Sequence, residues 1–411
     1  MNRLNRRKHT FRWPVAIALS AAGVFGIGLS TTVPAGASSA PTPVASPDHP
    51  VPTHGAGKTP KPRTSTCTLG ANGRLSTCAK PVSASRLPAG ARNRSTVSSA
   101  VSSPATMVDT RTWTSGGGNT FPGAEVPFGM TQWSPDTMPN RNAGGGYNYG
   151  DEELTGYSLT HVSGPGCGAA GDVPILPMTG ALPSGDPSAA TTSFTNTGEV
   201  AQAGYYSAES NLPNTITSQF TATPHSSMGE FTFPSTTSAD FLIKLMDSQN
   251  GDASSTAQVV GNNEVMGSDT SGDFCGESDN DGQSQLYTVY FDVVFSQPFT
   301  ASQVVTEAGQ TDPDSVFLTF NTTSNQTIEA KVGISYVSAA NAKLNWQTEN
   351  PGWNFNATKK TAQNAWNTLL GRIAVSGGSY AQTQEFYSLL YKDFLQPNIT
   401  SDVNGQFMGS D

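Results

Sequence analysis

Two stretches of the chain alternate apolar and polar residues with a period of two. In one, every second position from Tyr287 to Phe295 is apolar, and in the other the same holds from Ile328 to Tyr336. Successive side chains of a strand point to opposite faces of a sheet, so this alternation is typical of a strand that buries one face. The pattern therefore predicts two strands that pack against a common core.

Shorter candidate strands lie at residues 216–221, 230–233, 241–246 and 316–320, separated by clusters of Pro, Gly, Asn and Asp. The composition agrees, because 42 Gly and 28 Pro accompany only 13% charged residues. Such a balance suits turn-rich β structure better than helical bundles. We predict a mainly β fold, an antiparallel β-sandwich over residues 108–340.

The period becomes helical after about Ala339. Trp366, Leu369 and Leu370 share one helix face. Phe386 and Phe394 share another before a proline ends the run. These two helices have apolar faces without a visible partner, and residues 402–411 resemble an interior loop. We therefore expect a truncated sequence in which residues 341–411 begin a second, incomplete domain.

The first residues have the pattern of an export signal. Basic residues precede an apolar run at residues 15–29, and Ala35 to Ala37 form a small-residue cleavage site. We predict a signal peptide at 1–37, a secreted, extracellular protein, and no stable membrane insertion after cleavage. An uncleaved anchor is the alternative. Residues 38–107 are rich in Ser, Thr, Pro and Gly and are predicted to be a linker.

Four cysteines in an exported chain suggest two disulfides. Cys67 and Cys78 flank a short Gly/Asn-containing segment, which favours a local pair and leaves Cys167 with Cys275. A reactive Cys167 is the alternative. The chain has no Cys-x-x-Cys motif and no clustered histidines, so zinc is not expected.

The charge distribution argues against nucleic acid as a partner. The formal net charge is −9, and basic residues do not form a stripe outside the first dozen positions. Phosphate backbones are bound by clustered Lys and Arg. A neutral, hydroxyl-rich ligand remains compatible with this chain.

Several motifs occur in a fixed order along the chain. They are GGNTFPGAEVPFGM (117–130), SPDT (134–137), GYNYGD (146–151), GYSLTHVSGPGC (156–167), GD (171–172), AGYY (203–206) and TATP (221–224). In this order they resemble the N-terminal part of family 92 glycoside hydrolases, the calcium-dependent exo-α-mannosidases. The resemblance covers about residues 108–411, and the helical segments are similar to the start of the family's (α/α)6 catalytic barrel.

The resemblance implies an inverting exo-α-mannosidase that acts on terminal mannose of N-glycans or mannan. Its general acid and base are expected beyond Asp411, and so are most ligands of the implied calcium. The family commonly has a histidine near Asn119, and residues 250–283 look like an acidic, Gly/Ser-rich insertion. The acidic residues from Ser268 to Asp281 lack the spacing of an EF-hand loop and are predicted to be solvated.

This part of the chain is expected to supply a wall that contacts the sugar. The candidates share turn-rich or aromatic surroundings, and they are Asn119, Phe121, Tyr149, His161, Asp172 and Asp411. Glycine-rich loops let the backbone approach a ligand, while a few polar or aromatic side chains fix its orientation. Each has a structural alternative: a loop histidine satisfied by backbone, an Asx-turn, or a core aromatic.

Two other functions stay open at this point. The sandwich alone is compatible with a non-catalytic carbohydrate-binding module. A peptide N-glycanase-like amidase is the third reading, but it requires a Cys-His-Asp arrangement or an equivalent acid pair, and the sequence shows neither.

Overall fold

The computed structural model describes residues 97, 99–276 and 285–409. The predicted signal peptide (1–37), most of the predicted linker (38–107), Cys67, Cys78 and Asp411 lie outside the described residues. Within the described ranges, no helix combines the length and apolar character needed to cross a membrane.

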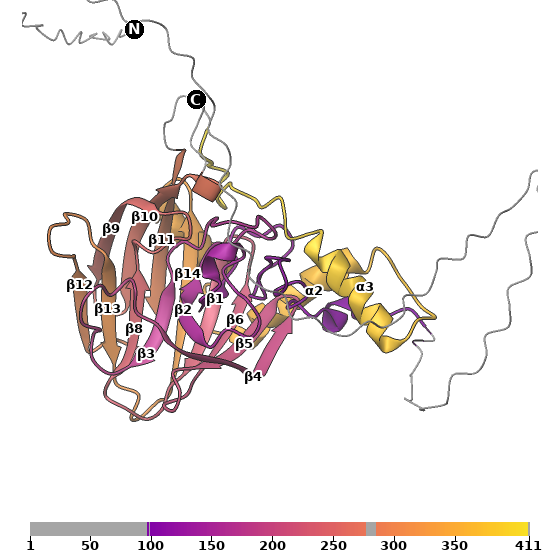
Figure 1. The fold of residues 1–411 in the computed structure, drawn as a ribbon, viewed down its shortest axis with the longest axis horizontal. Coiled ribbons are helices and arrows are strands. Elements are labelled where there is room, and N and C mark those ends of the chain that lie inside the picture. Colours follow the sequence, from indigo (N-terminus) through magenta and orange to yellow (C-terminus); the bar gives the residue numbers. More distant parts are fainter. Residues whose placement is uncertain (1–96, 98, 277–284, 410–411) are drawn as a thin grey trace, which may run out of the picture. The chain divides into compact units, whose positions relative to one another are not determined.

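Antiparallel strands are the main regular secondary structure of the described chain (Figure 1). The strands are β1 (Ser134–Met138), β2 (Glu153–Ser158), β3 (Ile175–Thr179), β4 (Thr192–Gln202), β5 (Tyr205–Ser210), β6 (Ile216–Ala222), β7 (Ser226–Thr232), β8 (Ala239–Lys244), β9 (Asp252–Val260), β10 (Glu264–Gly272), β11 (Leu286–Phe295), β12 (Ala301–Val305), β13 (Ser315–Phe320) and β14 (Thr327–Ser335).

All of these strands belong to one 14-stranded sheet. Its order is β12-β13-β8-β3-β2-β4-β5-β6-β7-β14-β11-β10-β9, and β1 pairs with β2 outside this path. The two terminal strands of the path, β12 and β9, contact each other, so the sheet is nearly closed. The prediction of a mainly β, antiparallel fold is confirmed.

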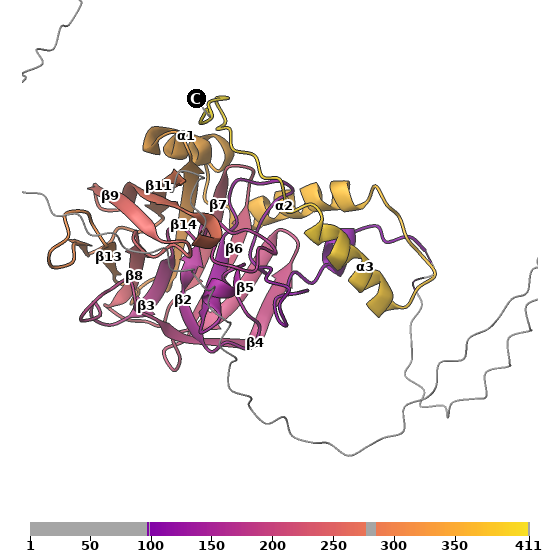
Figure 2. The same cartoon turned by 45° about the horizontal axis from the view of Figure 1, so that its top comes forward.

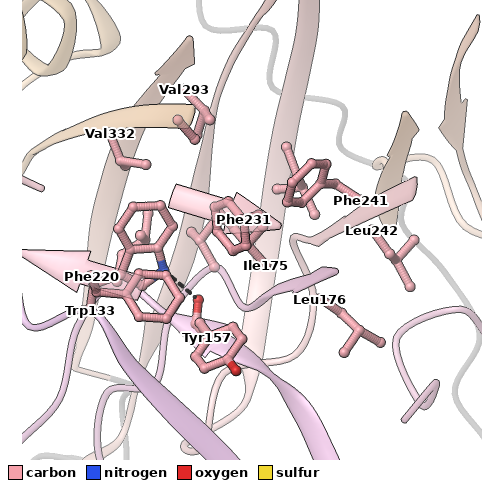
Figure 3. Packing of buried hydrophobic residues seen from close by; sticks show 14 of the residues in the cluster. Trp133, Tyr157, Ile175, Leu176, Phe220, Phe231, Phe241, Leu242, Val293 and Val332 are labelled. Atoms are coloured by element: carbon pink, nitrogen blue, oxygen red, sulfur yellow. Dashed lines mark hydrogen bonds between the residues drawn. The ribbon is translucent and has the colours of Figure 1, made fainter. Parts of the chain in front are cut away.

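The alternating stretches form neighbouring strands with matched registers. In the β11–β14 pair, Phe291 lies opposite Ile334 and Val293 opposite Val332, and all four side chains are buried. Figure 3 shows this packing around Trp133, whose indole Nε1 donates a hydrogen bond to the Tyr157 carbonyl oxygen at 3.1 Å. The core therefore uses the faces that the alternation indicates.

Within residues 250–276, the described part of the predicted acidic insertion, the expectation of a solvated loop is wrong, whereas Glu277, Asp279 and Asp281 lie outside the described residues. Most of the segment is the β9–β10 hairpin, and β10 lies between β9 and β11. Asp269, expected in solvent, is fully buried on β10. Gly, Ser and Asp have low strand propensity, so pairing on both sides determines this strand, and the sequence pattern does not reveal it.

Three α-helices follow the strands: α1 (Ala339–Glu349), α2 (Phe355–Leu370) and α3 (Tyr380–Lys392). Three short 3-10 helices lie elsewhere, η1 (Pro104–Met107), η2 (Arg141–Ala143) and η3 (Phe274–Gly276). Side chains cap the N-termini of all three α-helices, and Ser379 and Gln382 form a capping box at α3. The predicted helical tail is confirmed.

The helices α2 and α3 do have a packing partner, contrary to expectation. They pack against η1, which the sequence placed in the linker, and Figures 1 and 2 both show this contact. The resulting second core contains Ala105, Met107, Val108, Phe121, Ala203, Trp366, Leu370, Tyr387, Tyr391 and Leu395. The end of the predicted linker is therefore part of the folded unit.

Helix α1 packs on β14 and β11, and the C-terminal segment is bonded to both α1 and β14. The buried Asp402 carboxylate accepts hydrogen bonds from Ser335 Oγ (2.8 Å), Asn341 Nδ2 (2.7 Å) and Asn345 Nδ2 (2.8 Å). Four separate positions of the chain are thus joined through one side chain.

A buried carboxyl beneath α1 yields a pH-dependent prediction. Burial raises the pKa of Asp292 to about 7 although Trp346 Nε1 donates to Oδ1 at 2.7 Å. A raised folded-state pKa contributes stability at low pH that is lost as the pH rises through about 7. We expect Asp292→Asn to raise the free energy of unfolding by about 2 kcal/mol more at pH 8.5 than at pH 5, because the loss begins above the unfolded-state pKa of about 4 and is complete only above about 7.

Urea unfolding followed by fluorescence at both pH values measures this difference. Asp393→Asn removes an exposed carboxylate at the end of α3 and serves as the control, with no difference expected between the two pH values. An equal effect of Asp292→Asn at pH 5 and pH 8.5 would contradict the prediction.

Candidate functional site

A pocket of about 270 Å³ lies where the loops at one end of the sheet meet the segment after α3. Its lining residues are Met130, Gln132, Thr160, His161, Val162, Ala170, Asp172, Phe274, Tyr287, Tyr336 and Asn398. Two of the predicted contact residues, His161 and Asp172, are among them. The pocket thus combines the β2–β3 loop with distant parts of the sheet and with the helical segment.

The β2–β3 loop has a defined shape because its two sides bond to each other. The Leu159 amide donates to the Asp172 carbonyl oxygen at 2.9 Å, and the Gly171 amide donates to the Thr160 carbonyl oxygen at 3.0 Å. Gly171 has φ +76°, and a Cβ there would collide with the Gln249 side chain at 2.7 Å. Glycine is therefore required at this position.

A disulfide between Cys167 and Cys275 joins this loop to η3. The Cys275 amide also donates to the Gly168 carbonyl oxygen at 3.0 Å. This is the expected pairing of these two cysteines. Since Cys167 is bonded to Cys275, it is not a free nucleophile, which removes the reading of Cys167 as a reactive thiol.

His161 is fully buried at the side chain and has a partner for each ring nitrogen. Nε2 lies 2.8 Å from Asp136 Oδ1, and Nδ1 lies 2.9 Å from the Gln132 carbonyl oxygen. Neither nitrogen is left for a sugar hydroxyl. The structure thus gives His161 a positioning role at the pocket wall in place of the predicted direct contact.

An ion network behind His161 fixes its position. Arg141 Nε donates to Asp136 Oδ2 at 3.0 Å, and Arg141 Nη1 donates to Asp247 Oδ1 at 2.7 Å. Burial opposes ionisation of Asp136, but the Arg141 guanidinium and His161 hold its pKa below the usual value. Asp136 is therefore an ionised carboxylate within β1.

Asp172 is buried and uses both carboxylate oxygens within the protein. Thr160 Oγ1 donates to Oδ2 at 2.5 Å, and the Tyr287 hydroxyl lies 3.0 Å from each oxygen. Burial raises the pKa of this carboxyl to about 6. Asp172 thus anchors Tyr287 at the pocket, and its direct contact with a sugar stays a prediction.

The pocket is also lined by three aromatic side chains that were not predicted from the sequence, Phe274, Tyr287 and Tyr336. The ring centroids of Phe274 and Tyr287 are 5.5 Å apart, and those of Tyr287 and Tyr336 are 6.4 Å apart. Phe274 is 46% exposed, so it presents an open face. Aromatic faces suit the C–H surface of a pyranose ring.

The aromatic residues chosen from the sequence lie elsewhere. Phe121 is 1% exposed in the second core, with its ring centroid 5.3 Å from that of His161. Tyr149 is 48% exposed but lines another pocket, of about 590 Å³, together with Asn196. Neither lines the pocket at His161, because one is enclosed by helices and the other lies beside β4.

Asn119 lies beside the β2–β3 loop and does not line the pocket. Its backbone is in the left-handed region at φ +53°, and its carbonyl oxygen accepts a hydrogen bond from the Gly164 amide at 2.7 Å. The side chain is half-buried. The structure therefore gives Asn119 a role in supporting the loop.

The pocket residues do not fit a calcium ion. Among the described residues that line it, Asp172 is the one carboxylate, and hydrogen bonds occupy both of its oxygens. A calcium ion takes 6 to 8 oxygen ligands.

Comparison with known families accounts for nearly all of the described chain. Residues 107–335 match the model of the glycosyl hydrolase family 92 N-terminal domain, and residues 341–411 match that of the family's catalytic domain. The β sheet with its pocket, followed by helices, therefore belongs to a glycoside hydrolase. The chain is a member of glycosyl hydrolase family 92.

Solved structures agree with this assignment. The family GH92 α-mannosidase BT3965 of Bacteroides thetaiotaomicron is 27% identical with a TM-score of 0.65, over 75% of this chain and 43% of that chain. The GH92 glycosyl hydrolase ccman5 is 25% identical with a TM-score of 0.64, over 74% of this chain and 43% of that one.

A secreted glycosidase of Arthroderma benhamiae, described as uncharacterized, is 25% identical to this chain. The match covers 71% of this chain and 41% of the relative. The chain thus spans less than half the length of the proteins it matches.

Proposed function

We propose that this chain is the N-terminal part of a secreted, inverting exo-α-mannosidase that acts on terminal mannose of N-glycans or mannan. Its role is to contribute carbohydrate-contacting surface. One observation carries the proposal: the pocket has walls from both matched regions, since His161 and Tyr287 lie in the N-terminal region and Asn398 lies in the catalytic one. Ligand sites often form at such junctions.

The chemistry of inversion requires two carboxyl groups about 6.5–9.5 Å apart, one to protonate the leaving oxygen and one to activate water. In the described part of the chain, the pocket contains the single carboxyl of Asp172. We propose that the acid and base of the whole protein are supplied by sequence beyond Asp411. Calcium, with ligands mostly outside this chain, is part of the same proposal.

For the whole protein we further propose that the nearly closed sheet has the form of a two-layered sandwich. We also propose that α2 and α3 are the first helices of an (α/α)6 barrel. Support for a mannose-type ligand comes from a relative: BT3965 has been solved in complex with mannoimidazole, at 26% identity and a TM-score of 0.65. In this chain we assign recognition of the pyranose face to Phe274, Tyr287 and Tyr336.

The assignment of the aromatic wall is tested by Phe274→Ala in the full-length enzyme. Removing an aromatic face that stacks on a ring costs about 1–3 kcal/mol, so we expect kcat/KM for α-1,2-mannobiose to fall about 5- to 150-fold. The control is Tyr380→Ala, which removes an exposed aromatic ring at the start of α3. Equal kcat/KM values for the two variants would contradict the proposed role of Phe274.

The reaction class is tested separately. Early-time NMR of the full-length enzyme with an α-mannoside should show β-mannose first, as inversion requires. EDTA should abolish turnover. Initial release of the α-anomer would overturn the inverting mechanism, and a protein that binds mannobiose without releasing mannose would identify a non-catalytic binding module.

A further inference from the structure

Three carboxylates meet at the rim of the sheet, away from the pocket described above. Asp186 lies in the β3–β4 loop, Glu307 in the β12–β13 loop, and Asp314 immediately before β13. One oxygen of each lies within 4.8 Å of one oxygen of the other two. Two loops that are far apart in the sequence therefore place like charges close to one another.

The described structure supplies no positive side chain to offset this arrangement. Within residues 99–276 and 285–409, the ion pairs of Lys, Arg and His involve other carboxylates. Like charges at this distance destabilise a fold unless a cation lies between them.

Asp314 provides a second, independent sign of a ligand. Its side chain is 5% exposed, and within the described structure its Oδ2 has no hydrogen-bond partner. Buried polar atoms are nearly always paired, so an orphaned carboxylate oxygen indicates a missing ion or water. This residue also lines a pocket of about 440 Å³.

The backbone around two of the carboxylates is held in place. The Asp314 amide donates to the Val305 carbonyl oxygen at 2.8 Å, and the Leu245 amide donates to the Asp314 carbonyl oxygen at 2.9 Å. Asp186 Oδ1 accepts from the Ser188 amide at 2.8 Å. Two of the three carboxylates are thus positioned before any ligand arrives.

The donor chemistry selects the class of ion. The pocket walls add further oxygen-bearing side chains, namely Ser188, Gln310, Thr311 and Asp312. Carboxylates, amide and hydroxyl oxygens and water suit a hard cation, whereas zinc and copper prefer nitrogen and sulfur. A roomy pocket with many oxygen donors favours calcium over magnesium, which demands a tight octahedron.

We propose that Asp186, Glu307 and Asp314 bind a calcium ion that fastens the β12–β13 loop to the β3–β4 loop. The site stabilises the terminal strands of the sheet path, where β12 approaches β9. The proposal depends only on these described residues and does not require the calcium ion to take part in catalysis. Its failure would leave the proposed mannosidase function untouched.

Calorimetric titration of CaCl2 into the chain, after treatment with EDTA and its removal, tests the site. Glu307→Gln removes a half-buried loop carboxylate, so its folding should be preserved, and Asp314→Asn is the second variant. We expect one calcium-binding event that each substitution weakens at least tenfold. The control Glu385→Gln removes an exposed carboxylate on α3 and should bind like the unaltered chain.

Thermal unfolding distinguishes a calcium site from simple repulsion between the carboxylates. The difference in Tm between Glu307→Gln and the unaltered chain should have opposite signs in CaCl2 and in EDTA. With calcium bound, saturating CaCl2 should raise the Tm of the unaltered chain by about 5 °C and that of Glu307→Gln by much less. In EDTA the variant should be the more stable, because a repelling charge is gone. Unchanged calcium binding by both variants, or no calcium-dependent shift in the unaltered chain, would overturn the site.

Discussion

Replacement of Arg141 by methionine should lower the free energy of unfolding by about 3–5 kcal/mol. Arg141 is 5% exposed and bonds both Asp136 and Asp247. Methionine fills much of the same volume but leaves the fully buried Asp136 without its guanidinium partner. A buried carboxylate without adequate compensation is costly, so the loss exceeds that of an ordinary surface ion pair.

Urea unfolding at pH 7 measures this loss, with Arg111→Met as the matched control. Arg111 pairs with Asp109 at 2.9 Å, and both side chains are about 30% exposed (30% and 31%). A pair of this kind contributes about 0–1 kcal/mol. Equal losses for the two methionine variants would show that the network behind His161 does not stabilise the site.

Replacement of Trp366 by alanine should cost about 3–5 kcal/mol, because a large buried aromatic side chain leaves a cavity. The indole is fully buried, its ring centroid is 4.3 Å from that of Tyr391, and Nε1 donates to the Glu125 carbonyl oxygen at 2.6 Å. The effect should also extend to proteolysis, with α2 and α3 cut at lower protease concentrations than in the unaltered chain.

The control for Trp366→Ala is Trp113→Ala, since Trp113 is 56% exposed. We expect that variant to unfold within about 0.5 kcal/mol of the unaltered chain. If Trp366→Ala behaved like Trp113→Ala, the second core would contribute little, and the helices would be only loosely attached to the sheet.

The sequence predicted those parts of the fold that depend on local pattern. Alternation identified β11 and β14, and the helical period identified α2 and α3, because in both cases side-chain spacing alone determines which face is buried. It could not reveal β10, whose Ser, Gly and Asp residues are strand-forming only through pairing with β9 and β11. It also could not reveal η1 as a helix partner, since the Ala105 amide bonds Asn367 Oδ1 across 262 positions.

The candidate site shows the same division. The motif containing His161 and Asp172 pointed to the correct loop, but their roles depend on Asp136 and Tyr287, which come from other strands. Tyr287 and Tyr336 fall on the apolar positions of the alternating pattern, which core residues also occupy, so the pattern alone does not distinguish a pocket residue from a core residue. Their place at the pocket follows from lying at one end of the sheet, beside the loop that the disulfide holds.

The hydrogen bonds of Asp402 limit how this protein can be divided for expression. The carboxylate belongs to the region matched to the catalytic domain, yet it accepts from Ser335 on the last strand and from Asn341 and Asn345 on α1. A fragment that stops near residue 340 would lose this acceptor, and it would also lose the helices that cover Phe121 and η1. The smallest unit that folds independently therefore crosses the boundary between the two family models. Chimeras of relatives joined at that boundary should be insoluble unless the C-terminal segment is exchanged together with the sheet.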